Sequence, residues 1–147
     1  KDGRAASAGS ILVTRLMKRG VAGVVTDGGF RDSPEIARLS IPAYHQRPSA
    51  PTNLTLHQAI DIDVPIGCGD VPVFPGDVVV GDSEGVVVIP AGIADGIADE
   101  ATEMTAFEDF VTEKVHQGHG ILGLYPATDE QTRVDYAAWR KANGRNR

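Results

Sequence analysis

The first 30 residues change from a helical hydrophobic pattern to the pattern of a buried strand. From Ser7 to Arg19 apolar residues recur at the spacing of one helix face, with basic residues in the last turn and Gly20 as the stop. Residues 21–26 (VAGVVT) are rich in β-branched side chains and predict a strand buried on both faces. The Asp-Gly-Gly that follows at 27–29 is typical of a turn.

A helix start and another strand are predicted after this turn. Ser33 stands before Pro34, which is typical of an N-cap followed by the first helical position, and predicts a short helix to about Leu39. Residues 41–46 (IPAYHQ) favour a strand. Residues 47–55 hold two prolines among small polar residues and predict a loop.

The middle of the chain reads as a compact β region. Residues 60–66 alternate isoleucine or valine with aspartate or proline, the pattern of a half-buried strand. Two valine-rich runs at 78–81 and 86–90 predict strands, and residues 82–85 (DSEG) predict the hairpin turn between them.

The last third of the chain is predicted to be helical. Residues 91–117 are expected to form one long helix or two joined helices. The apolar residues near helical spacing are Ile93, Ile97, Met104, Val111 and Val115, and Phe107 and Phe110 fall close to the same face. A final helix is predicted with Asp129 as N-cap and Gly144 as stop, and with Val134, Tyr136 and Trp139 as its less polar positions.

Composition narrows the setting and the partners. The 147 residues suffice for one domain, and 14 basic against 20 acidic residues give a net charge of −6, which disfavours nucleic acid or an anionic membrane surface as a direct partner. Cys68 is the only cysteine, so an internal disulfide is excluded and a reducing cytoplasmic location is the simplest expectation. No apolar run approaches the length of a membrane span.

Arg31 and Asp32 are the first candidates for chemistry. They follow a predicted strand and precede a predicted helix, where open α/β sheets bind ligands and where helix N–H groups favour an anion. A guanidinium can grip a carboxylate, and an aspartate offers a hard oxygen to Mg²⁺ or Mn²⁺. From this dipeptide alone, the favoured interpretation is that Asp32 caps the short helix and Arg31 is a surface charge.

The remaining candidates have strong structural interpretations. His116 and His119 could hold zinc on one helix face, but glycines surround them and no third ligand is evident, so a solvated helix end is the default. His45 and His57 flank the proline-rich loop and could reach a substrate, although a structural role is the simpler expectation. Cys68 lies among glycines without a legible histidine partner, and three acidic residues belong to turn motifs: Asp77, Asp82 and Glu84.

Two longer motifs carry a family resemblance. GSILVTRLMKRGVAGVVTDGGFRD (9–32) and DVPIGCGDVPVFPGDVVVGDSEGVVVIP (63–90) resemble the RraA-like family of 4-hydroxy-4-methyl-2-oxoglutarate/4-carboxy-4-hydroxy-2-oxoadipate aldolases, oxaloacetate decarboxylases and the regulator of ribonuclease activity A. The likeness covers roughly residues 5–115. It implies an α/β fold of the swivelling β/β/α type, assembled as homotrimers or hexamers with active sites at subunit interfaces.

The resemblance also divides the chain. Residues 1–127 are expected to form the C-terminal portion of the RraA-like domain, because family members usually carry a further N-terminal segment that here could be lost or come from a separate chain. The helix within residues 128–147 could dock on this domain or on a neighbouring subunit.

The family's aldolase signature is an aspartate, twenty intervening residues and Arg-Asp. Counting back from Arg31 reaches Ser10, where catalytic members carry an acidic residue. By resemblance, Asp32 binds Mg²⁺ or Mn²⁺ and Arg31 grips the pyruvyl unit, whose carboxylate meets backbone N–H groups from these residues: Gly9, Ser10, Ile11 and Leu12. Serine can hydrogen-bond a water but cannot hold the charge that makes it basic, so Ser10 puts turnover in doubt more than binding.

Two functions from different classes follow. The leading expectation is a metal-dependent lyase that cleaves a C–C bond in a pyruvate-containing acid, by retro-aldol cleavage or oxaloacetate decarboxylation through one enolate. The alternative is a non-catalytic regulator that binds a ribonuclease, which Ser10 and the acidic composition favour. The keto acid itself is not specified, although residues 44–58 could line the pocket with His45, Arg47 or His57 selecting a second carboxylate.

Overall fold

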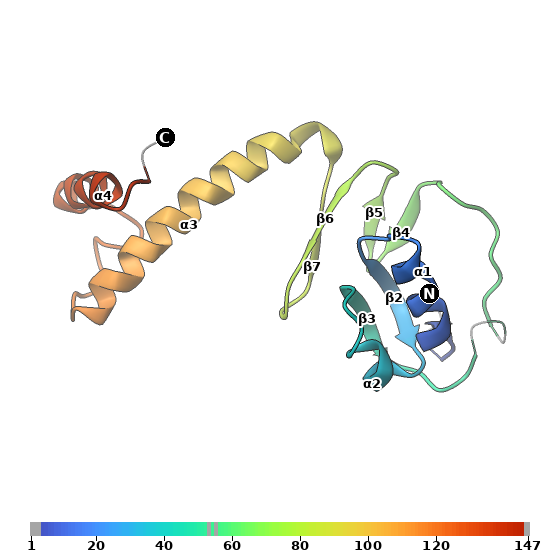
Figure 1. Ribbon diagram of the computed structural model, residues 1–147. Coiled ribbons are helices and arrows are strands. Elements are labelled where there is room, and N and C mark those ends of the chain that lie inside the picture. Colours follow the sequence, from blue (N-terminus) through green and yellow to red (C-terminus); the bar gives the residue numbers. More distant parts are fainter. Residues whose placement is uncertain (1–3, 53, 55, 146–147) are drawn as a thin grey trace. The chain divides into compact units, whose positions relative to one another are not determined.

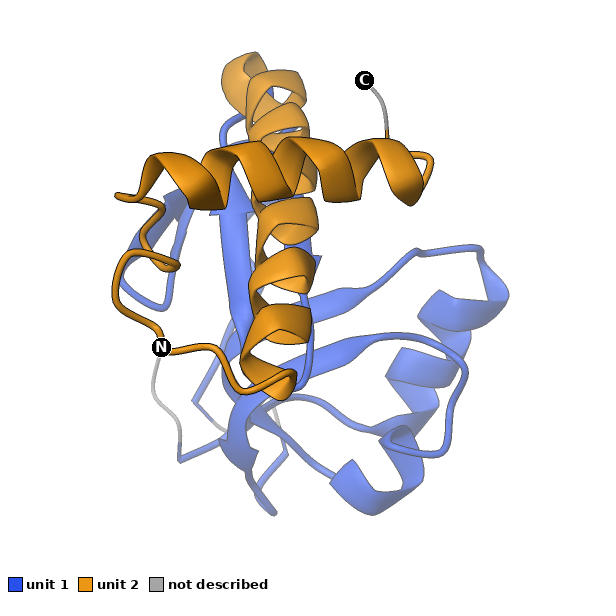
Figure 2. Cartoon of the chain, turned by 90° about the vertical axis from the view of Figure 1, so that its left-hand side faces the viewer, with its two compact units in different colours: residues 1–91 blue, residues 92–147 orange. Residues whose placement is uncertain are grey.

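The computed structural model describes residues 4–52, 54 and 56–145. They form two compact units, residues 1–91 and residues 92–147, which Figure 2 colours separately. Within the described residues, no helix combines the length and the apolar character needed to cross a lipid bilayer.

A three-stranded parallel sheet organises the first unit (Figure 1). Its strands, in spatial order, are β1 (Ala6–Ala8), β2 (Val24–Phe30) and β3 (Ala43–Pro48). Helix α1 (Ser10–Lys18) connects β1 to β2, and α2 (Ser33–Ile36) connects β2 to β3. Both helices pack on one apolar cluster, whose buried members are Ala8, Val13, Phe30, Ile36 and Ile41. Parallel pairing needs such crossovers, and they place both helix N-termini just beyond strand ends.

Two predictions for this sheet are wrong in an instructive way. The helix begins at Ser10 rather than Ser7, because residues 6–8 are small enough to pair as a strand beside β2. The glycines at 28 and 29 belong to β2 and not to a turn. A Cβ at Gly28 would lie 2.5 Å from the Ser7 hydroxyl, and one at Gly29 would lie 2.6 Å from the Ser49 Cβ. These glycines therefore permit close strand packing.

The observed bounds of α2 and β3 also differ from the predicted ones. Asp32, not Ser33, is the N-cap of α2, without a side-chain capping bond, and the helix ends at Ile36. Strand β3 was correctly predicted but continues through Arg47 and Pro48, into the predicted loop. Residues 53 and 55 of that loop lie outside the described residues. Strand β2 is not buried on both faces throughout, since Val25 is exposed.

The β region contains two antiparallel hairpins. Strands β4 (Ile66–Cys68) and β5 (Val71–Val73) form one, and β6 (Val78–Gly81) and β7 (Val86–Ile89) form the other, as the valine runs predicted. The turn between β6 and β7 is held by Asp82, whose Oδ1 accepts the Glu84 and Gly85 N–H groups at 2.8 and 3.2 Å. Asp77 likewise accepts the Phe74 N–H, which confirms the turn interpretation of both aspartates.

The strand predicted at 60–66 is wrong over most of its length. Residues 60–65 form no strand, and Ile60 and Ile62 are almost fully exposed. Asp61 instead accepts the Ile62 N–H within the loop, and Asp63 adopts a positive φ of 59°. Alternation produces a strand only when another strand pairs with it, and local aspartate bonds compete with that pairing.

The second unit is a pair of helices. The short 3-10 turn η2 (Ala91–Ile93) begins at the last residue of the first unit and leads into α3 (Ala94–His116), a single long helix, and α4 (Glu130–Ala142) follows. Tyr136 and Trp139 of α4 pack on Phe107 and Phe110 of α3, with ring centroids 5.1–6.2 Å apart along the cluster. The packing face of α3 therefore centres on its phenylalanines, while three residues predicted for that face stay exposed: Ile97, Met104 and Val115.

Candidate functional site

The candidate site lies where β1 and β2 end. Because the two strands are parallel neighbours, their carboxyl ends lie at the same edge of the sheet, and the Arg31 N–H donates to the Ala8 carbonyl at 2.9 Å. Gly9 and Ser10 follow β1, and Arg31 and Asp32 follow β2. Open α/β sheets bind ligands at this kind of position.

The side chain of Asp32 is held at the N-terminus of α1. Its Oδ2 accepts the Ser10 N–H at 3.2 Å and the Ser10 hydroxyl at 3.1 Å, and the Arg31 Nε lies 3.5 Å from the same oxygen. The two halves of the sequence motif, 22 positions apart, therefore meet through one carboxylate oxygen. Both charged side chains remain partly open to solvent.

The backbone at Asp32 and Gly9 makes this approach possible. Asp32 has a φ of 57° and a ψ of 36°, a left-handed conformation that aspartate tolerates better than most residues. A Cβ at Gly9 would lie 3.1 Å from the Asp32 Oδ2 and 3.4 Å from the Arg31 Nε. Glycine therefore leaves the space in which the carboxylate and the guanidinium approach the helix.

Hydrogen bonds from Ser10 lower the pKa of the Asp32 carboxyl group. The Ser10 backbone N–H lowers the pKa of Asp32 below 3.8, its desolvation opposes that change, and the Ser10 hydroxyl and the Arg31 charge lower the pKa further. All of these donors favour the ionised form. Asp32 is thus a carboxylate throughout the neutral pH range.

The start of α1 adds donors to the same place. In a helix the first N–H groups have no intrahelical acceptor, and the Val13 N–H is the first to reach back, to the Gly9 carbonyl at 3.1 Å. The N–H groups of Ile11 and Leu12 are therefore available to a ligand, and both side chains are exposed. An anion at this position would gain two donors, the helix dipole and the nearby guanidinium.

The Asp32 carboxylate is the hard oxygen donor that the site offers to a divalent cation. Within residues 4–52, 54 and 56–145, no group of three or more His, Cys, Asp or Glu side chains could hold a metal ion. The Ser10 and Arg31 contacts of the Asp32 carboxylate all involve Oδ2, so Oδ1 is the oxygen that could serve as a metal ligand. Mg²⁺ is often bound through one or two carboxylates with water and substrate oxygens, so this single hard oxygen fits that mode.

His45 lies on β3 and Cys68 on β4, whereas the four residues of the candidate site follow β1 and β2. His45 is on β3 and stacks on the buried Phe30 ring with centroids 5.0 Å apart, while its Nδ1 is buried and has no hydrogen-bond partner within the described structure. His45 and Cys68 both line a separate cavity of about 520 Å³. His116 is the last residue of α3 and His119 lies just beyond it, as the helix-end interpretation predicted.

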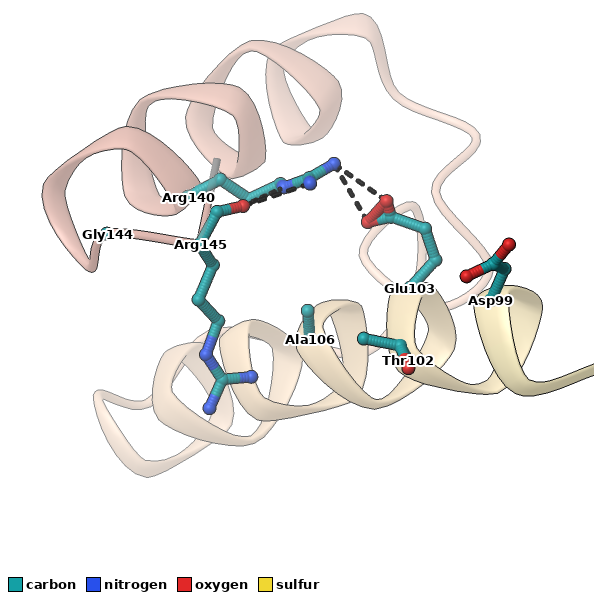
Figure 3. A pocket seen from close by; sticks show the side chains of 7 residues that line it. All are labelled: Asp99, Thr102, Glu103, Ala106, Arg140, Gly144 and Arg145. Atoms are coloured by element: carbon teal, nitrogen blue, oxygen red, sulfur yellow. Dashed lines mark hydrogen bonds and ion pairs between the residues drawn. The ribbon is translucent and has the colours of Figure 1, made fainter. Parts of the chain in front are cut away.

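A larger cavity in the second unit is lined by two arginines that are both ion-paired within the unit. It has a volume of about 690 Å³ and lies between α3 and the end of α4 (Figure 3). The Arg140 guanidinium is held by both Glu103 oxygens at 2.8 Å and by the Arg145 carbonyl at 2.9–3.0 Å. The Arg145 guanidinium is in turn paired with Asp109 at 2.7 Å. Both cations are therefore engaged within the unit.

Sequence reasoning missed the support beneath the candidate site. The hydroxyls of Ser7 and Thr26 lie 2.7 Å apart, and the buried Thr26 Oγ1 accepts the Gly28 N–H at 3.0 Å. These contacts join the middle of β1 to the middle of β2, on the strands that lead into the site. The only signal in the sequence was a pair of small hydroxyl residues beside runs of alanine and glycine.

Three comparisons relate the chain to known proteins. A family model described as "Aldolase/RraA" matches residues 1–88. A Halalkalibacterium halodurans protein named "Putative 4-hydroxy-4-methyl-2-oxoglutarate aldolase" is 34% identical over 104 residues, which cover 71% of this chain and 49% of that protein. An uncharacterized protein of Methanocaldococcus jannaschii is 35% identical over 105 residues, which cover 70% of this chain and 49% of that protein.

Solved structures agree with this relationship. An uncharacterized protein of Pseudomonas syringae pv. tomato shares the fold with a TM-score of 0.76 at 22% identity, covering 82% of this chain and 60% of its own. Streptomyces coelicolor RraAS2, described as an unusual member of the RNase ES inhibitor RraA protein family, has a TM-score of 0.66 at 32% identity, covering 75% and 56%. The chain spans about half the length of the curated relatives it matches.

Proposed function

Because the chain belongs to the RraA-like family, we propose that it is a divalent-metal-dependent lyase acting on a pyruvate-containing acid. The observation that supports this most directly is the meeting of Arg31, Asp32 and the α1 N-terminus around one carboxylate oxygen. The name of the Halalkalibacterium halodurans relative points to the same class of reaction.

Each part of the site has a proposed role in binding. The Arg31 guanidinium and the N–H groups of Ile11 and Leu12 would hold the carboxylate of the pyruvyl unit, since together they offer a charged fork and a positive helix end. Asp32 would hold Mg²⁺ or Mn²⁺ through Oδ1. Such a cation supplies Lewis-acid stabilisation of the negative charge that develops on the keto oxygen as the C–C bond breaks.

Ser10 favours one of the two family reactions over the other. Retro-aldol cleavage needs a base that accepts the substrate hydroxyl proton. The Ser10 hydroxyl donates its hydrogen bond to Asp32, and a serine hydroxyl is not deprotonated at neutral pH, so Ser10 cannot act as that base. Decarboxylation of an oxaloacetate-like acid releases CO₂ and needs no hydroxyl deprotonation. We therefore expect decarboxylation to be the stronger of the two activities.

The test is a decarboxylation assay of the purified chain with oxaloacetate and Mg²⁺ or Mn²⁺, before and after chelation. Arg31→Ala and Asp32→Asn are each expected to lower kcat/KM by about a hundred-fold or more, because Arg31 would hold the substrate carboxylate and Asp32 would hold the cation that stabilises the developing charge. Arg38→Ala and Asp70→Asn are matched controls: Arg38 is exposed beyond α2, and Asp70 shares the positive φ of Asp32, at 62°. Activity that survives chelation or Arg31→Ala would refute the mechanism.

Ser10→Asp sharpens the assignment. A carboxylate at position 10 would supply the missing base, so retro-aldol turnover should rise by about 10²–10⁴-fold, and decarboxylation much less. Calorimetric Mn²⁺ titration gives a readout independent of turnover, since a second carboxylate beside Asp32 should tighten cation binding. Equal effects on both reactions would contradict the proposed role of position 10.

A regulatory function is the second candidate. It is favoured by Ser10 at the position where the family signature has an acidic residue and by the likeness to Streptomyces coelicolor RraAS2, whose description names an RNase ES inhibitor family. In that case the chain would bind a ribonuclease and show no lyase turnover. Measurable metal-dependent turnover without capture of any ribonuclease in a pull-down would eliminate this candidate.

A further inference from the structure

The pairing of β2 with β3 contains one extra residue. Thr26 pairs with His45, and the next pair joins Gly29 to Arg47. Three residue steps of β2 therefore span two steps of β3, which is the pattern of a β-bulge. The extra residue lies within residues 27–28 of β2. Bulges are common beside active sites, where they change the direction in which a strand presents the residues that follow.

The pairing of β1 with β2 is also irregular. Ala6 pairs with Gly29 and Ala8 pairs with Phe30, so two steps of β1 span one step of β2. The extra residue is Ser7, which lies between the two pairs. Both strands that lead into the candidate site therefore carry an extra residue, and these residues decide how the ends of β1 and β2 are aligned.

A pair of hydroxyl groups holds both irregularities. The Ser7 and Thr26 hydroxyl oxygens lie 2.7 Å apart, and either one can donate. The Gly28 N–H is buried and donates within its own strand, to the Thr26 Oγ1 at 3.0 Å. The described ladders give Gly28 no strand pair, and a buried N–H without an acceptor is costly. The Thr26 hydroxyl therefore stabilises the bulge.

The alignment of the two strand ends decides whether the site assembles. The Arg31 N–H donates to the Ala8 carbonyl at 2.9 Å, and the Asp32 Oδ2 accepts the Ser10 N–H at 3.2 Å. A slip of β2 by one residue would move its groups by about 3.3 Å along the strand. It would also turn each following side chain to the other side of the sheet. Both contacts would then be lost.

We propose that Thr26 and Ser7 are positioning residues for Arg31 and Asp32. Their hydroxyl pair fixes the two bulges, and the bulges set the alignment at which the guanidinium and the carboxylate meet the N-terminus of α1. Both residues act through Arg31 and Asp32 rather than on the substrate. The assignment rests on the proposed function for the role of the site, whereas the alignment itself is measured without substrate.

Hydrogen exchange of single backbone amides, followed by NMR without substrate or metal, tests the alignment. The measured quantity is the exchange rate of the Arg31 amide, beyond the bulge, divided by that of the Val24 amide, which donates to the Pro42 carbonyl before the bulge. Thr26→Val removes the hydroxyl at nearly constant volume and should raise this ratio by about ten-fold or more. Thr26→Ser keeps a hydroxyl and should retain the ratio of the parent.

Ser7→Ala is the milder variant, because it removes one member of the pair and leaves the Gly28 bond intact. It should raise the ratio by about two-fold or more. Ile41→Val is the matched control, since it removes one methylene from the buried cluster outside the strands and should accelerate both amides equally. The proposal would be overturned by a ratio that Ile41→Val or Thr26→Ser raises as much as Thr26→Val does, or that neither hydroxyl-deleting variant raises.

Kinetics connect the alignment to the proposed reaction. Thr26→Val should lower kcat/KM for oxaloacetate decarboxylation by about ten-fold or more, because small misplacements of binding groups cost much of the rate. Thr26→Ser and Ile41→Val should stay near the parent. Absence of turnover in the parent would refute the proposed function, and the exchange ratio would still decide the alignment. An active parent whose kcat/KM is unchanged in Thr26→Val would overturn the positioning role.

Discussion

The parallel β1–β2–β3 layer and the β6–β7 hairpin are built from similar β-rich sequences but differ in how their residues are covered. In the layer, Phe30 of β2 is buried against Val13 of α1 and Ile36 of α2. In the hairpin, valines of the same character remain about half exposed: Val79, Val80 and Val87. A β-branched run therefore indicates a strand, but it does not indicate which segment will cover that strand.

The parallel layer and the hairpin also differ in the kind of chemical group that they present. Crossover helices cover the parallel layer and bring a helix N-terminus to the ends of β1 and β2, which creates the site at Asp32. The hairpin is flanked by turns at Asp77 and Asp82 and its strands carry no charged residue, so it presents apolar side chains rather than charged groups. The first region therefore offers charged and N–H groups to a small ligand, and the second offers exposed valines.

The largest expected effect comes from breaking the packed layer. Phe30→Ala should lower the free energy of unfolding by about 3–5 kcal/mol, because it leaves a cavity between two helices and the sheet. Val80→Ala in the hairpin should change it by less than about 0.5 kcal/mol, since the side chain is already half exposed. Urea denaturation followed by circular dichroism measures both. Similar losses would show that the two regions are equally packed.

A smaller effect is expected from glycines, again with one in each region. Gly29→Ala should destabilise the chain by about 1–3 kcal/mol, because its Cβ would lie 2.6 Å from the Ser49 Cβ and 2.9 Å from the Arg47 carbonyl oxygen. Gly85→Ala in the hairpin turn has nothing within 4 Å and should be neutral or stabilising by up to about 1 kcal/mol. The same denaturation experiment decides; a neutral Gly29→Ala would contradict the close packing of β2 and β3.

The smallest effect concerns the charge at the strand end. Ser10→Ala removes one hydroxyl donor from Asp32 and should raise its pKa toward 3.8, while the backbone N–H of residue 10 still lowers it. Since the folded pKa is below the unfolded value, the stabilisation from these bonds is present above the unfolded pKa and is lost as the pH falls through the folded pKa. The Asp32 carboxyl ¹³C shift followed against pH measures this. An unchanged pKa would show that the hydroxyl does not bond Asp32 in solution.

The sequence predicted much of the local structure because the signals were local. Valine runs flanking an Asp-Ser-Glu-Gly turn fixed the β6–β7 hairpin, and helical spacing with a terminal glycine fixed most of α1. It also selected Arg31 and Asp32, since residues between a strand and a helix commonly carry chemistry. Their grouping with Ser10 came from the family resemblance and not from any local pattern.

Errors arose where distant residues decide the local conformation. Asp-Gly-Gly at 27–29 was predicted as a turn, yet these glycines lie in β2 because Ser7 and Ser49 leave no space for a Cβ. Residues 60–66 alternate as a strand should, yet most of them find no pairing partner in the described chain. Strand β1 was missed because three small residues carry almost no hydrophobic signal.

By itself, the sequence determined the types of most elements and the acidic charge, and it singled out Arg31 and Asp32, because propensity and spacing act over a few neighbouring residues. Only the tertiary structure decided that β1 lies beside β2, and that Ser10 therefore donates to Asp32 across 22 positions. It also decided that the hairpin valines Val79, Val80 and Val87 stay about half exposed. Pairing and burial depend on which distant segments meet, and that information is not contained in any single stretch of the chain.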